Sequence, residues 1–393
     1  MTKFIKDFFM KFKIRGWKYK TLIIFLAVLY AGIISISFIK IPYELTSPNK
    51  ITNVESIISV AGDETNADIN TVSVLVTDKP SIMHYLISLM DKNIEKTPYS
   101  ENTSYYTTSE SNERGVWTKK QSIQDAIIWA FDYAAEKGYD VTLTDKYVGV
   151  CITGSPSYKL NNGPESLKIG DIVTKIGDTN VTDMNIFRQF VEDVHSTYGT
   201  VAAEEIPSIE IIRDEETITL TNCDADILNY LGNVSIYYNQ QNSLVSEEYF
   251  YDAYTITYAE CVPEITINTI NSIGPSAGFI HALYVYTQIT QSTILNDKYI
   301  VGTGTINNEG MVGEIGGLMQ KLKTADVYNT QYFFVPKGNI EYIIDGYTDI
   351  TDVEEQDQMI EDKVNELELE FGLTIIPISN VGDAIMYLEG LGD

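Results

Sequence analysis

The longest apolar stretch of the chain is Thr21–Ile39, nineteen residues without a charge. A helix of that length crosses the hydrocarbon core of a bilayer, so the pattern predicts one transmembrane span. Further along, apolar residues recur at helical spacing before Gly138, namely at Ile123, Ile127, Ala130, Phe131 and Ala134. This spacing predicts an amphipathic helix, with Ser122 and Asp125 placed as a capping box at its start. The polar residues 96–118 before it are typical of a long loop.

Shorter apolar runs between glycines and polar turns predict strands. These runs are Val72–Val76, Tyr147–Val150, Leu167–Val173, and a hairpin of Ser208–Ile212 with Thr217–Leu220. Helices are predicted over Ile82–Met90, from about Thr182 onward, and from Ala277 to about Gln288. Together the elements predict an α+β protein of several domains, with a β-rich module in the middle of the chain.

Charge is distributed unevenly along the chain. Residues 1–20 hold seven Lys and Arg against one Asp, whereas the whole chain carries −28, which leaves −34 for the rest. A remainder that acidic repels nucleic acid, so no nucleic-acid partner is expected. The few cysteines and histidines lie far apart, at Cys151, Cys223, Cys261, His84, His195 and His281. We therefore expect buried free thiols, no metal site and no cofactor.

The basic residues before Thr21–Ile39 predict the orientation of the span. Lys and Arg concentrate on the cytoplasmic side, so the amino terminus is expected in the cytoplasm and the rest outside the membrane. The rival interpretation is a cleaved signal peptide. Its apolar core is usually shorter, and Ser35-Ile36-Ser37 is a poor cleavage site, so a retained anchor is favoured.

The segment Gly274-Pro275-Ser276-Ala277-Gly278 places a serine in a tight turn before an apolar helix. The glycines permit close approach of backbone, and proline fits the first turn of a helix. Ser276 is therefore expected at a helix amino terminus, where backbone amides stabilise an oxyanion. We take Gly274, Pro275 and Ala277 as the turn and oxyanion residues of a candidate active site.

A serine hydroxyl becomes a good nucleophile only when a base takes its proton. His281 lies five residues along the same helix, about 140° around it, and points elsewhere. Lys321 is the alternative, because Leu318 and Ala325 share its helix face and burial makes a lysine easier to deprotonate. A plain loop-to-helix turn and a surface lysine would account for the same residues, so from the residues alone both interpretations remain open.

Residues 139–222 resemble a PDZ domain. The resemblance rests on the strand Tyr147-Val148-Gly149-Val150, the run Leu167–Val173 with its Gly-Asp turn, and the helix behind it. PDZ domains bind peptides as an added strand. The resemblance implies that the amides near Val148, Gly149 and Val150 receive a peptide terminus or carbonyl. The alternative is that Gly149 serves a tight turn.

Residues 265–393 closely resemble the proteolytic domain of Lon proteases, which are serine peptidases with a Ser–Lys dyad. The matching motifs are Gly274–Gly278, Gly302–Ile306, Gly313–Lys321, Phe333–Pro336 and Ile375–Ile378. The resemblance implies that Ser276 attacks the peptide bond and that Lys321 is first general base and then general acid. It also implies that Thr303 hydrogen-bonds the lysine. Ile273 stands where Lon enzymes often carry an acidic residue.

The whole arrangement is similar to the membrane-anchored PDZ–Lon proteases of Gram-positive bacteria. It implies a basic tail (1–20), an anchor (21–39), an extracytoplasmic segment (40–138), a PDZ-like domain (139–222) and a Lon proteolytic domain (223–393). The chain lacks a Gly-x-x-x-x-Gly-Lys loop, so we expect no ATP to be used.

The expected function is therefore ATP-independent serine endopeptidase activity at the outer face of the cell membrane, on protein or peptide substrates. The resemblance also allows a homo-oligomer. The alternative from another class is a membrane-tethered PDZ adaptor with an inactive Lon-like fold.

Overall fold

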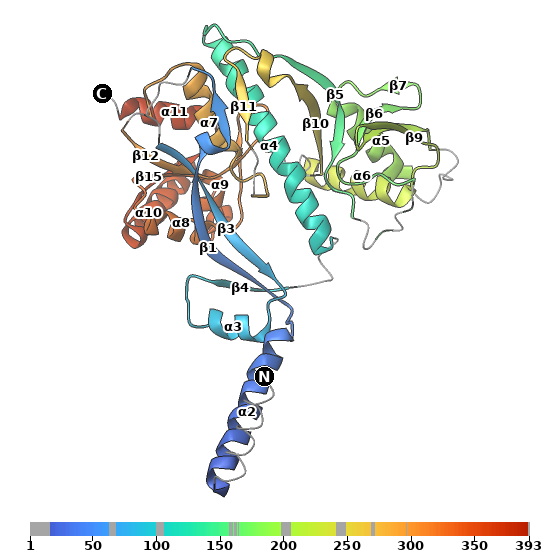
Figure 1. Cartoon of the computed structure of the whole chain (residues 1–393). Coiled ribbons are helices and arrows are strands. Elements are labelled where there is room, and N and C mark those ends of the chain that lie inside the picture. Colours follow the sequence, from blue (N-terminus) through green and yellow to red (C-terminus); the bar gives the residue numbers. More distant parts are fainter. Residues whose placement is uncertain are drawn as a thin grey trace. The chain divides into compact units, whose positions relative to one another are not determined.

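Figure 1 shows the chain as a computed structural model. The structure describes residues 16–62, 68–99, 106–156, 160, 163, 165–197, 206–240, 249–268, 272–295 and 297–391. Residues 1–15 of the predicted basic tail lie outside the described residues. The chain is a mixed α/β protein with several sheets. Its contacts divide it into one unit of residues 1–47 and 75–100 and another of residues 48–74 and 101–393. The predicted domain boundaries rest on a family resemblance and stay predictions.

The first unit contains the apolar helix α2 (Trp17–Phe38). Its residues Tyr19–Phe38 have a mean hydropathy of 2.4 and none of them is buried, so the helix is long and apolar enough to cross a membrane. A signal sequence near the amino terminus can pass the same test of length and composition. The same unit holds the predicted helix near residue 82, α3 (Ile82–Ser88), whose start is capped by Ser81. Strand β4 (Glu95–Pro98) pairs antiparallel with the start of β1 (Tyr43–Asn53).

The main sheet has the strand order β16-β15-β12-β3-β1-β4. Strands β3 (Asp68–Asp78), β12 (Tyr299–Gly302), β15 (Tyr332–Pro336) and β16 (Thr374–Ile378) are parallel neighbours. Alternate residues along these strands belong to two hydrophobic cores, one on each face of the sheet. Ile300 and Phe334 pack on one face, whereas Val301 and Phe333 pack on the other. This alternation is the two-residue period of a strand that is buried on both faces.

Helices cover both faces of these parallel strands. One core includes residues of α4 (Thr108–Glu136), α7 (Gly278–Ile289) and α11 (Val381–Gly390). The other includes residues of α8 (Leu318–Val327), α9 (Lys337–Tyr342) and α10 (Val353–Phe371). Two small ribbons complete this part: β2 (Ile58–Val60) with β11 (Ile265–Ile267), and β13 (Thr305–Ile306) with β14 (Val312–Gly313).

Helix α4 is longer than the sequence predicts. The predicted apolar face is buried, and Gly138 ends the helix with φ of +89°. The predicted start at Ser122 is wrong, because the helix begins at Thr108. The predicted loop over 96–118 is wrong for residues 96–98, which lie in β4, and for residues 108–118, whereas residues 100–105 lie outside the described residues. Thr107 and Glu110 form its capping box. The first turns of α4 are mostly polar, so they show no apolar period from which a helix could be recognised.

A second sheet has the order β10-β5-β6-β8-β9, with β7 paired to β6. Its strands are β5 (Asp145–Ile152), β6 (Ile172–Ile176), β7 (Thr179–Asn180), β8 (Ile209–Arg213), β9 (Glu216–Leu220) and β10 (Phe250–Ile256). Helices α5 (Met184–Thr197) and α6 (Ala225–Gln240) share its core. We call these elements the β5–β10 module. The predicted β8–β9 hairpin is confirmed, with positive φ at Asp214 and Glu215.

Strand β10 lies outside residues 139–222, yet it is hydrogen-bonded into the sheet of the β5–β10 module. Its first residue, Phe250, is fully buried, and its ring packs edge-on against Phe187 of α5 with centroids 5.3 Å apart. The sequence gives no clear period over residues 223–270. Burial of Phe250 explains why this segment completes the module.

Candidate active site

Ser276 lies in the turn that leads into α7, two residues before the first helical residue. Gly274 has φ of +89°, a conformation that glycine adopts without strain. The amide of Gly274 donates to the carbonyl of Gly115, and the hydroxyl of Ser122 donates to the carbonyl of Pro275, both at 2.8 Å. Two residues of α4 therefore hold the turn that carries Ser276.

Gly278 allows the start of α7 to approach its neighbours closely. A Cβ at this position would collide with the hydroxyl oxygen of Ser122 and with a methyl group of Ile306. The predicted need for glycine here is therefore explained by packing against α4 and β13.

Thr303 links Lys321 to the backbone of Ser276 by two hydrogen bonds. Lys321 lies on α8 with only 3% of its surface exposed, and its Nζ donates to Thr303 Oγ1 at 3.0 Å. The Thr303 hydroxyl, which is fully buried, donates to the carbonyl oxygen of Ser276 at 2.9 Å. The amide of Gly304 donates to the same carbonyl at 2.8 Å. The three residues selected from the sequence are therefore neighbours in the structure.

The environment of Lys321 favours its neutral form. Burial, and after it the like charge of Lys119, together lower the pKa of Lys321 to about 7. Leu318 and Ala325, predicted on the same helix face, are both buried. Within the part of the chain that the structure describes, no carboxylate pairs with the Lys321 amine. A neutral amine beside a serine can accept a proton.

Two backbone amides remain available at the nucleophile turn. The amide of Gly274 is taken by Gly115, and proline at 275 has no amide hydrogen. Among the described residues, the amides of Ser276 and Ala277 and the hydroxyl of Ser276 donate no hydrogen bond. Of the three predicted turn and oxyanion residues, Ala277 alone therefore offers a free donor.

The two histidines considered as alternative bases are not hydrogen-bonded to Ser276. His281 is fully buried on α7, and neither ring nitrogen has a partner in the described part of the chain. Burial lowers its pKa well below the usual range, and Lys119 adds to this. His195 instead contacts Asn229 at 2.7 Å within the β5–β10 module.

The backbone of Val148, Gly149 and Val150 lies in an internal strand of the β5–β10 module. β5 has β10 on one side, with Gly149 opposite Ala253, and β6 on the other, with Val150 opposite Val173. A Cβ on Gly149 would collide with the carbonyl of Val173, so close strand approach explains this glycine, not a tight turn. A peptide could add to β5 only by displacing β10.

Strand β10 is the outermost strand on that side, and α4 caps its edge. The side-chain amide of Gln124 donates to the carbonyl of Asp252 at 2.8 Å and accepts from the amide of Tyr254 at 3.1 Å. Gln124 thus makes the two hydrogen bonds that a neighbouring strand would make. No sequence pattern predicts this role of Gln124.

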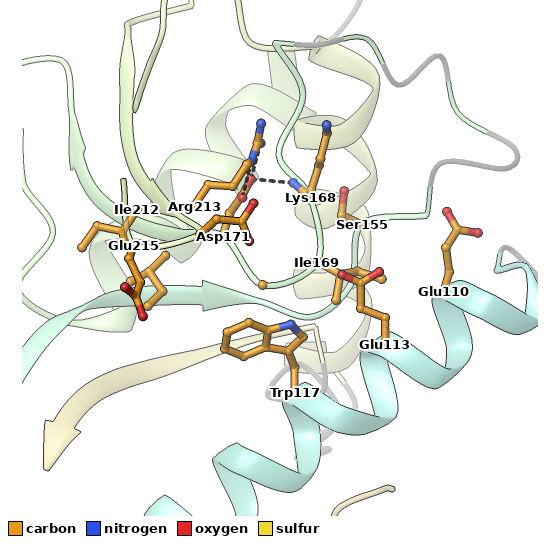
Figure 2. Close-up of a pocket in the computed structure, with 13 residues that line it drawn as sticks. Glu110, Glu113, Trp117, Ser155, Lys168, Ile169, Asp171, Ile212, Arg213 and Glu215 are labelled. Carbon is orange, nitrogen blue, oxygen red and sulfur yellow. Dashed lines mark hydrogen bonds and ion pairs between the residues drawn. The ribbon is translucent and has the colours of Figure 1, made fainter. Parts of the chain in front are cut away.

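A cavity of about 740 Å³ lies between α4 and the β5–β10 module (Figure 2). Ser276, Thr303 and Lys321 do not line it. Glu113 and Trp117 of α4 face it from one side. On the other side, Arg213 forms an ion pair of 2.6 Å with Asp171, which also accepts from the amide of Lys168. Asp171 is 1% exposed, so this pair fixes the predicted Gly-Asp turn.

No protein-family model matches the chain, and no curated protein is significantly similar to it. The candidate active site therefore rests on its own geometry and on the motifs in the sequence.

Proposed function

We propose that this protein is an ATP-independent, membrane-anchored serine endopeptidase of the PDZ–Lon type, in which Ser276 and Lys321 form the catalytic dyad. The observation that supports this best is the hydrogen-bonded chain from the buried Lys321 amine through Thr303 to the backbone of Ser276. A structural lysine would pair with a carboxylate or extend to solvent, and Lys321 does neither within the described residues.

The proposed reaction begins when Ser276 Oγ attacks the carbonyl carbon of a peptide bond. Lys321 takes the hydroxyl proton as a neutral amine and then gives it to the leaving amine, which leaves an acyl-enzyme. Water attacks the acyl group with Lys321 again as base. The free amides of Ser276 and Ala277 are the candidate donors to the oxyanion.

The β5–β10 module would position substrates in this proposal. Its likeness to PDZ domains comes from the sequence, and an extended peptide would add at a sheet edge. Because Gln124 already caps the edge of β10, the outermost strand on the other side, β9, is the candidate edge. Because no nucleotide-binding loop is present, substrates would be extended or loosely folded segments outside the cytoplasm.

Cleavage of a dye-labelled unfolded casein by the full-length protein in detergent tests the proposal. Ser276→Ala and Lys321→Ala should each abolish cleavage. Lys323→Ala is the matched control, since Lys323 lies on the same helix but is partly exposed and pairs with Asp326. Cleavage that survives Ser276→Ala would show that Ser276 is not the nucleophile, whereas an inactive wild type that still binds peptides would favour the adaptor.

A further inference from the structure

A stripe along α4 faces the turn that carries Ser276. Gly115, Lys119 and Ser122 follow one another at intervals of four and three residues, so they share one helix face. The carbonyl of Gly115 accepts a hydrogen bond from the amide of Gly274, and the hydroxyl of Ser122 donates one to the carbonyl of Pro275. Lys119 stands between these two contacts and must project toward the same turn.

Lys119 is a buried cation that the proposed reaction does not yet use. It is 5% exposed, and within the described residues it has neither a carboxylate nor any other hydrogen-bond acceptor. The neighbouring residue Lys120 is exposed, and the Lys120 amine lies 3.9 Å from the ring centroid of Trp117. Burying an ammonium without a counter-ion is costly, so Lys119 is not explained by packing alone.

We propose that Lys119 is a positioning residue for the dyad: its buried positive charge, directed at the Ser276 turn, keeps the nearby Lys321 amine unprotonated and ready to act as base. This inference rests on the proposed function and deepens it. It assigns to α4, outside the resemblance over residues 265–393, a group that acts through Lys321.

The charges around the two amines support this role. Lys119 from α4 lowers the pKa of both His281 from α7 and Lys321 from α8, and among the described residues no carboxylate contributes to these shifts. Burial lowers the pKa of Lys119 to about 8, whereas the pKa of Lys321 is about 7. Because Lys119 adds to the effect of burial at Lys321, Lys321 is the more easily deprotonated of the two amines.

Removing the Lys119 charge should raise the pKa of Lys321. Lys119→Met should therefore lower casein cleavage by about three- to tenfold at neutral pH, with wild-type rates regained in alkaline solution, where both amines are neutral. Lys119→Arg keeps the charge and should leave the acid limb of the pH–rate profile at its wild-type position. Lys120→Met is the matched control and should leave the profile unchanged.

The experiment measures kcat/KM against pH for these variants of the full-length protein, with Ser276→Ala as the blank. An acid limb that moves to higher pH only in Lys119→Met supports the inference. An unmoved limb, or a loss that is the same at every pH, overturns it.

Inactivity of the wild type would count against the proposed function alone. In that case, NMR titration of the Lys321 side chain in the wild type and in Lys119→Met decides the inference. The Lys321 signal is assigned by its loss in Lys321→Met. A midpoint that is the same in the wild type and Lys119→Met would refute it.

Discussion

Thr303 joins the lysine to the nucleophile turn through one hydroxyl group. That hydroxyl accepts from Lys321 and donates to the Ser276 carbonyl, while the Thr303 amide donates to Phe334 of β15. The parallel pairing of β12 and β15 therefore fixes the position of Thr303. Because the sheet holds Thr303, the lysine can be oriented by a neutral group without a counter-charge.

Thr303→Val should lower kcat/KM by about 10- to 100-fold, since it removes hydrogen bonds worth about 1.5–3 kcal/mol. Thr303→Ser keeps the hydroxyl and should retain most of the activity. The measurement is casein cleavage by the two variants at one pH. Equal activity of Thr303→Val and the wild type would show that the hydroxyl does not orient Lys321.

Lys321→Met should stabilise the fold at neutral pH while abolishing activity. The folded pKa of about 7 lies below the usual 10.5, so the unfolded chain binds more protons between these values. The free energy of unfolding contributed by Lys321 is therefore lowest below pH 7 and rises up to about pH 10.5. The variant lacks this penalty, on the order of a few kcal/mol at pH 7.

Urea denaturation of the wild type and Lys321→Met across pH 6–10.5 measures the difference. The advantage of the variant should shrink as pH rises. A difference that stays constant over this range would mean that Lys321 is not protonated on unfolding in the expected window.

At the scale of elements, α4 connects the candidate active site with the β5–β10 module. Its residues 115 and 122 hold the Ser276 turn, and its Gln124 caps the edge of β10. The apolar face of α4 was predictable from its period, because apolar residues at helical spacing identify a buried stripe. Its polar contacts were not, because they depend on which distant segments meet that helix.

Gln124→Ala should destabilise the protein by about 1–3 kcal/mol, because it leaves the carbonyl of Asp252 and the amide of Tyr254 without their partner. Gln121→Ala is a matched control on the same helix, since Gln121 is only half-buried. The urea midpoint of each variant gives the comparison. If both substitutions cost the same within about 0.5 kcal/mol, Gln124 is not a structural cap.

At the scale of the whole molecule, an apolar helix precedes a strongly acidic remainder. The chain carries −28 overall, and α2 has no charged side chain between Thr21 and Phe38. A helix of this length and composition can cross a bilayer. The candidate active site lies in the unit of residues 48–74 and 101–393, and α2 belongs to the other unit.

We expect the full-length protein in the membrane fraction after an alkaline carbonate wash, and a variant without residues 17–38 in the soluble fraction. Amino-terminal sequencing of the membrane-bound protein distinguishes an anchor from a signal peptide. A mature chain that begins after residue 38 would contradict the retained anchor.

The sequence by itself determined the apolar span, the buried face of α4 and the strands β3, β5, β8 and β9, because these follow from local periods of 2 and 3.6 residues. It offered Ser276 and Lys321 as candidates, and the resemblance to Lon proteases, which rests on short continuous motifs, added Thr303 to them. Only the tertiary structure decided that β10 completes the β5–β10 module and that β5 is internal. It alone decided that Lys119 and Gln124 serve the site and the sheet edge. Contacts between distant segments depend on which faces pack together, and a local period carries no information about that choice.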